Sequence, residues 1–81
     1  MLATIGSMTM ASRCAKTIWR AMAIPAKVVA TPARINKGGC SYSITFDDRY
    51  EKDVRNIAEK FNLPIKKWYK EDTWHEAYDL S

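Results

Sequence analysis

The first half of this chain lacks acidic residues altogether. All nine aspartates and glutamates fall between Asp47 and Asp79, and the formal net charge is +4. The cations that precede Asp47 are Arg13, Lys16, Arg20, Lys27, Arg34 and Lys37. A basic surface on a small domain favours anionic ligands or partners. An acid-free start with arginine and serine also occurs in mitochondrial targeting peptides. Because this stretch carries two elements of the predicted fold, we expect a cytoplasmic protein instead.

Cysteines are few and apolar runs are short. Cys14 and Cys40 are the two cysteines of the chain, too few to hold a secreted mini-protein of this size together by disulfides. Even with His75 they supply fewer soft ligands than the four of a structural zinc site. No run approaches the roughly 18 apolar residues of a membrane span. We therefore expect a soluble protein with reduced thiols and with no metal, no cofactor and no membrane partner.

The chain is long enough for one domain with one core, since it has 81 residues of which 47% are hydrophobic. Hydrophobic periodicity and breaker residues divide it into elements. These are a strand over residues 1–7, a helix from a cap at Ser7 or Thr9 to Ile24, a strand over 26–31, a loop over 32–40, a strand over 41–46, a helix over 48–61 and a strand over 65–70. Pro25 ends the first helix because proline cannot continue it.

The order β-α-β-β-α-β predicts a ferredoxin-like α+β sandwich, a four-stranded antiparallel sheet with two helices on one face. This domain covers residues 1–70. Residues 71–81, with Trp74, Ala77 and Tyr78, form a C-terminal tail or a short helix. In this topology the turn before the first helix and the loop after the second strand lie at the same end of the sheet. We therefore expect Cys14 and Cys40 to lie near each other without an obligatory disulfide.

The strand over residues 41–46 alternates between apolar and polar side chains. Tyr42, Ile44 and Phe46 share one face and Ser43 lies on the other. We expect the first three beneath the helices and Ser43 exposed, so that Ser43→Ala is nearly neutral. The helix residues expected to cover this face are Ile18, Met22, Val54, Ile57 and Phe61.

The loop that ends in Cys40 is the strongest candidate for chemistry. Gly38 and Gly39 precede the thiol and allow close approach of a ligand to backbone N–H groups. Arg34 and Lys37 supply nearby positive charge, which favours a thiolate, a persulfide or a bound anion. Cys40 can equally be a buried structural residue that opens a strand. Cys14 falls within the apolar stripe of the first helix and is a core residue or a resolving thiol.

The sequence resembles the small-domain family described as "Putative Se/S carrier protein-like", over about residues 1–70. The matching pieces are Ile24-Pro25, the strand at 27–31, Pro32 and Arg34, Cys40, the strand at 42–46, and the segment from Phe61 to Ile65. The chain departs from the family where Ala33 separates Pro32 from Arg34, where Lys37-Gly38-Gly39 replaces serines, and where Ser41 replaces glycine. The resemblance implies a thiol-based carrier for sulfur or selenium, with its cargo on Cys40 and a donor or acceptor protein as partner.

Two other functions remain open. One is a non-catalytic small subunit or adaptor that docks through its basic surface and the aromatic tail at residues 74–81. The other is a nucleic-acid binder, driven by charge because the positions where bases stack in RNA-recognition modules hold Ser41 and Ser43. Known catalytic motifs are missing, so a carrier or binding protein is favoured over a stand-alone enzyme. The state of Cys40 separates a carrier, which needs a reactive thiol, from an adaptor.

Overall fold

The computed structural model describes residues 1–35 and 41–70. Along the chain the elements are β1 (Leu2–Gly6), α1 (Met8–Met22), β2 (Lys27–Ala30), β3 (Tyr42–Thr45), a 3₁₀ turn η1 (Asp48–Tyr50), α2 (Glu51–Lys60) and β4 (Lys67–Tyr69). The order expected from the sequence is confirmed, although each strand is shorter than the residue range predicted for it. The tail expected at 71–81 lies outside the described residues.

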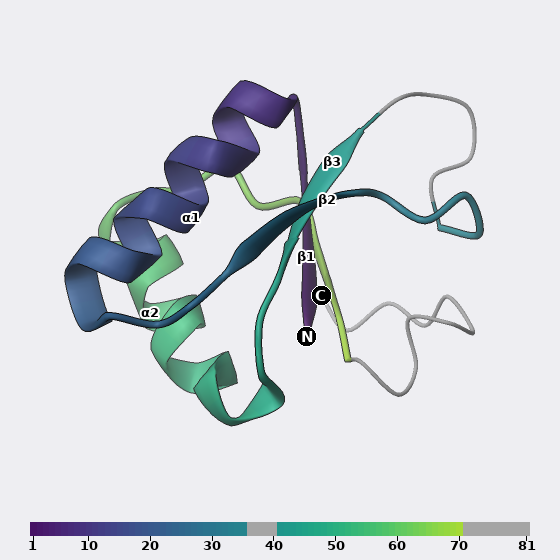
Figure 1. Cartoon of the computed structure of the whole chain (residues 1–81). Coiled ribbons are helices and arrows are strands. Elements are labelled where there is room, and N and C mark those ends of the chain that lie inside the picture. Colours follow the sequence, from purple (N-terminus) through teal and green to yellow (C-terminus); the bar gives the residue numbers. More distant parts are fainter. Residues whose placement is uncertain (36–40, 71–81) are drawn as a thin grey trace.

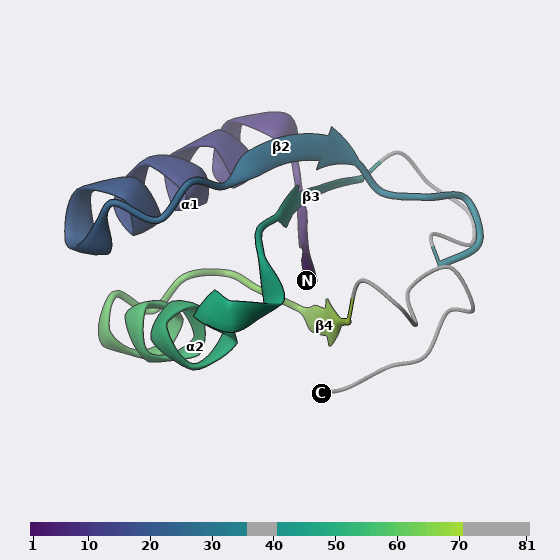
Figure 2. The same cartoon turned by 60° about the horizontal axis from the view of Figure 1, so that its bottom comes forward.

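The four strands form one antiparallel sheet in the order β2-β3-β1-β4. Both helices lie on the same side of it, α1 beside β2 and β3, and α2 towards β4 (Figures 1 and 2). The predicted α+β class is therefore confirmed, in an arrangement compatible with a ferredoxin-like sandwich. Gly6 at the end of β1 pairs with Tyr42 at the start of β3. The end of β1, the start of α1 and the base of the β2–β3 loop thus share one end of the sheet.

Local signals in the sequence set the ends of the helices. Ser7 caps α1, since its hydroxyl accepts a hydrogen bond from the Met10 amide at 3.2 Å. The helix ends where Ala23 adopts a left-handed φ of 54°, two residues before Pro25. Asp47 caps the 3₁₀ turn by accepting from the Arg49 amide at 2.9 Å. The second helix proper therefore begins at Glu51. The acidic pair Asp48 and Glu51 had suggested a start at Asp48.

The core lies between the helices and the inner face of the sheet. Ile44 of β3 and Ala3 of β1 are neighbours at its centre and both are fully buried. Phe46 and Trp68 meet edge to face, with ring centroids 6.4 Å apart. The guanidinium of Arg55 lies 4.7 Å from the Trp68 ring centroid and covers it from the side of α2. This core holds both helices on the sheet.

Three expectations about burial are wrong. Met22 and Phe61 are 53% and 50% exposed, because Met22 is the last residue of α1 and Phe61 follows the last residue of α2, beyond the part of each helix that packs on the sheet. Ser43 is 0% exposed, although it faces away from the helices. It lies in a central strand between Thr4 and Val29, and its hydroxyl is hydrogen-bonded. Ile44 and Phe46 are buried as expected, and Tyr42 is half-buried.

Candidate functional site

The predicted site residues fall into two groups. Arg34 is exposed in the turn that follows β2, and Cys14 is buried in the middle of α1. Lys37, Gly38, Gly39 and Cys40 lie outside the described residues. The structure therefore describes both ends of the loop that contains Cys40, from Thr31 to Ile35 and from Ser41 onward. These two described ends form the base of the loop.

A chain of three hydroxyl groups closes the base of the loop. Ser41 Oγ donates to Thr31 Oγ1 at 2.7 Å, and Thr31 Oγ1 lies 2.6 Å from Ser43 Oγ. The backbone adds a hydrogen bond from the Thr31 amide to the Ser41 carbonyl at 2.9 Å. Thr31 and Ser43 are buried, so the bond between their hydroxyl groups is protected from water. Together with the partly buried bond from Ser41 it holds the two ends of the loop together.

A pocket of about 220 Å³ opens beside this base. Thr31 and Ser41 line it from the loop, Gly6 from the end of β1, and Lys66 from the residue before β4. Gly6 has a φ of 149°, at a point where the register of β1 against β3 shifts. The Lys66 ammonium stands 3.9 Å from the place that a Cβ on Gly6 would take. The pocket therefore combines hydroxyl groups with a cation.

Lys66 is the residue that reasoning from sequence missed. The run of lysines at 66–67 suggests no more than a solvated strand face. In the fold, the Lys66 amide donates to the Thr4 carbonyl at 2.8 Å, which places Lys66 beside the end of β1. The antiparallel pairing of the first and last strands, already implied by a ferredoxin-like topology, was the signal that could have found it.

The start of α1 lies at the same end of the sheet. The helix follows β1 after the single cap residue Ser7, and its first turn contains no acidic side chain. Unpaired amides at a helix start carry partial positive charge. Together with Arg34 and Lys66, they make this end of the domain favourable for an anion.

Cys14 has a different environment from that of a reactive thiol. It is 1% exposed and packs in the core with Ala11 and Ile18. Burial raises its pKa, and the neighbouring positive charge of Arg13 only partly opposes this. The thiol is therefore held in its protonated, weakly nucleophilic form at neutral pH.

Within residues 1–35 and 41–70, no group of three or more His, Cys, Asp or Glu side chains could hold a metal ion. No helix in these ranges is long and apolar enough to cross a membrane.

Comparison with known proteins identifies the family. Residues 1–70 match the family described as "Putative Se/S carrier protein-like". The chain belongs to this family. The match spans β1 to β4 and includes the loop with Cys40 as well as the pocket at its base. Neither a curated protein nor a solved structure gave a significant match.

Proposed function

We propose that this protein is a small thiol-based carrier in sulfur or selenium handling and that Cys40 bears the cargo. Membership of the Se/S carrier-like family supports the general role. The observation that supports the site most is the base of the loop. Cys40 is bonded directly to Ser41, whose hydroxyl and carbonyl take part in the closure with Thr31. Ser41, the neighbour of Cys40 in the chain, is thus held at a fixed point beside a pocket that contains the Lys66 cation.

The chemistry is a thiol exchange. The Cys40 thiolate attacks the outer sulfur of a donor persulfide, the donor S–S bond breaks, and the donor leaves as a thiolate. Cys40 then carries the persulfide, and the reverse exchange delivers it to an acceptor thiolate. A donor with a terminal selenium reacts by the same exchange. Each step needs negative charge on the Cys40 sulfur, which Arg34, Lys37, Lys66 and the amides of Gly38 and Gly39 favour.

Cys14 is a second thiol that can take part in this scheme. As a resolving thiol it attacks the inner sulfur of the Cys40 persulfide, which releases hydrosulfide and forms a Cys14–Cys40 disulfide. Its burial and raised pKa make this the slower step. The proximity of the two cysteines remains a prediction. Disulfide mapping after persulfide treatment tests it, since a disulfide requires Cα atoms about 4.4–6.8 Å apart.

Mass spectrometry tests the carrier role directly. The protein is exposed to a persulfide donor, or to a selenosulfide donor whose terminal atom is selenium, and the added atom is located by peptide mapping. We expect the adduct on Cys40, its loss in Cys40→Ser, and its retention in Cys14→Ser. Labelling confined to Cys14, or none at all, would end the proposal.

The effect of the positive charges on the Cys40 thiol is tested by the pH profile of its alkylation with iodoacetamide. We expect a midpoint for Cys40 below the ordinary cysteine pKa of about 8.5, moved upward by Arg34→Ala, Lys37→Ala and Lys66→Ala. Lys52→Ala, on the exposed side of α2, is the matched control and leaves the midpoint unchanged. A midpoint at or above the ordinary value in every variant contradicts a thiolate site.

The same geometry bears on the adaptor and nucleic-acid functions. Base stacking needs exposed rings on the sheet face opposite the helices. In the part of that face that the structure describes, the aromatic ring is that of Tyr69, which is buried. This disfavours nucleic-acid binding by stacking. The adaptor function predicts an unreactive Cys40, so the alkylation profile separates it from the carrier.

A further inference from the structure

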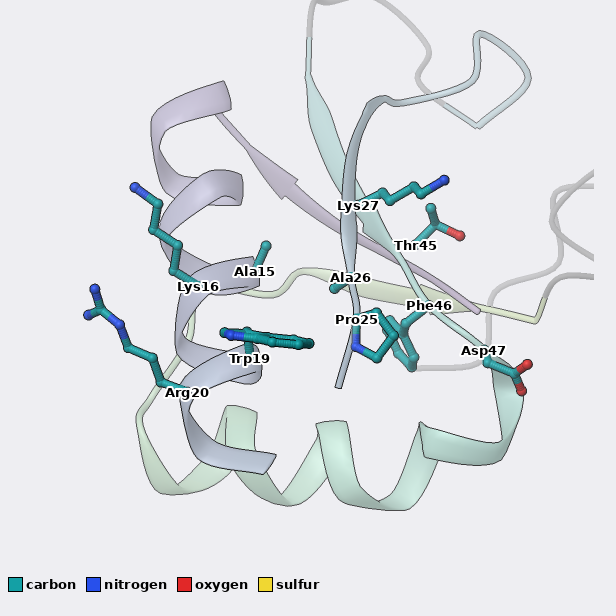
Figure 3. A pocket seen from close by; sticks show the side chains of 10 residues that line it. All are labelled: Ala15, Lys16, Trp19, Arg20, Pro25, Ala26, Lys27, Thr45, Phe46 and Asp47. Atoms are coloured by element: carbon teal, nitrogen blue, oxygen red, sulfur yellow. The ribbon is translucent and has the colours of Figure 1, made fainter. Parts of the chain in front are cut away.

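A second surface, which takes no part in the proposed thiol chemistry, lies between α1 and the start of β2. It is an open groove of about 800 Å³. Trp19 reaches from α1 towards Pro25, and Phe46 forms part of the floor (Figure 3). The Trp19 side chain is 57% exposed, and Met22 on the next turn is exposed as well. A large aromatic ring left half in water at the side of a groove is a typical anchor for a partner.

The groove is flanked by positive charge. Lys16 and Arg20 extend from α1, and Lys27 extends from β2 on the other side of Trp19 (Figure 3). No ion pair within residues 1–35 and 41–70 involves any of these three cations. The one acidic group at the groove, Asp47, is already paired with Arg49 at 3.3 Å. The groove therefore presents uncompensated positive charge around an apolar centre.

The open edge of the sheet runs along this groove. In the described part of the chain β2 pairs only with β3, so its other edge carries no strand. The Thr31 amide bonds the Ser41 carbonyl, and hydrogen-bonded pairs alternate along an antiparallel ladder. By that alternation the backbone N–H and C=O groups of Val28 and Ala30 point outward. These groups can accept an additional strand.

The two faces of β2 determine which side chains an additional strand paired with its open edge needs. Val28 is paired with Ile44 and packs on the core, so residues opposite Val28 face the helix side and Trp19. Lys27 is paired with Thr45 and faces the other side. Because side chains alternate along a strand, a complementary segment has apolar residues towards Trp19 and acidic residues beside Lys27.

We propose that the β2 edge and the Trp19 groove form a docking site for an extended segment of a partner protein that alternates apolar and acidic residues. Such a segment adds as a fifth strand to β2 and covers Trp19. A second copy of this chain is a poorer occupant, because pairing β2 with β2 would bring the cations of two grooves together. The site does not use Cys40 and is independent of the proposed carrier chemistry.

Fluorescence anisotropy tests the docking site on the full chain. The probe is a short fluorescein-labelled peptide that alternates valine and glutamate, with a glutamine version for comparison. We expect saturable binding of the acidic peptide, weakened by added salt, and much weaker binding of the glutamine version. Cys40→Ser leaves the affinity unchanged, which separates this result from that of the carrier.

Substitutions of exposed residues show where on the protein the peptide binds. Trp19→Ala should lower the affinity about tenfold or more, as for an aromatic anchor, and Lys27→Glu several-fold. Ala30→Pro removes an outward N–H at an edge position that tolerates proline and should also weaken binding. Phe61→Ala and Lys52→Glu remove a half-exposed ring and an exposed cation elsewhere and should have no effect. Circular dichroism and melting temperature verify that each variant is folded.

Four results would overturn the proposal. The first is the absence of saturable peptide binding. The second is equal binding in all variants. The third is tighter binding of a single-stranded oligothymidylate than of the peptide, lost on the same substitutions, which would make the groove a nucleic-acid site. A dimer in sedimentation that disappears in Trp19→Ala would likewise replace the partner segment by a second copy.

Discussion

The hydroxyl chain at the base of the β2–β3 loop should be a measurable part of the stability of the domain. Ser43 is fully buried, and its hydroxyl lies 2.6 Å from that of Thr31. Ser43→Ala leaves the Thr31 hydroxyl with its bond from Ser41 but without its partner in the interior. A buried polar group that loses its partner costs about 1–3 kcal/mol. For a domain of this size each 1 kcal/mol lowers the melting temperature by about 4–8 °C.

A double-mutant cycle makes the test specific. Ser43→Ala and Thr31→Val are measured alone and together by urea denaturation, with Ser12→Ala in α1 as the control. Ser12→Ala should be neutral or slightly stabilising, because alanine is the better helix former. The two substitutions at the loop base should cost less together than the sum of their separate costs, by about 1 kcal/mol. A cost for Ser43→Ala below about 0.3 kcal/mol, or strict additivity, would refute the reasoning.

Three further predictions concern the core, the helix cap and the buried thiol. Ile44→Ala should destabilise the domain by about 2–5 kcal/mol in urea denaturation; a loss below 1 kcal/mol would contradict its central position. Ser7→Ala should cost about 0.5–2 kcal/mol in the same assay, and Ser7→Asp should restore most of it; equal losses in both variants would argue against capping. For Cys14 the folded state has the higher pKa, so folded and unfolded chains are equally protonated below the ordinary thiol pKa of about 8.5, and above it the unfolded chain alone loses the proton. Stability should therefore fall as the pH rises past that value, and Cys14→Ala should reduce this slope; an unchanged slope would refute it.

The elements of the fold were predictable because local chemistry determines them. The Ser7 cap and Pro25 bound the first helix, and alternation identifies β3. Alternation says which residues share a face, but not whether that face is covered, and this is why Ser43 was misjudged. Helical spacing likewise does not show where the partner surface ends, so the exposure of Met22 escaped prediction.

The sites depend on contacts between distant parts of the chain. Lys66 reaches the loop base only through the pairing of β4 with β1, and a run of lysines carries no sign of that pairing. Trp19 reads as one more apolar residue of a helical stripe. Its exposure beside the open edge of β2 follows from the position of α1 on the sheet, which no local pattern encodes.

The closure at Thr31 and Ser41 also makes the fold a natural scaffold for engineering. Because hydrogen bonds join Thr31 to Ser41, the chain leaves the sheet at Thr31 and returns at Ser41 at neighbouring points of a fixed frame. Lengthening the loop between them carries only a small entropic cost, about 0.6 kcal/mol for each doubling of a flexible loop. The frame can therefore accept libraries of loop sequences, in which the number and spacing of cysteines are varied while the sheet and helices stay as they are.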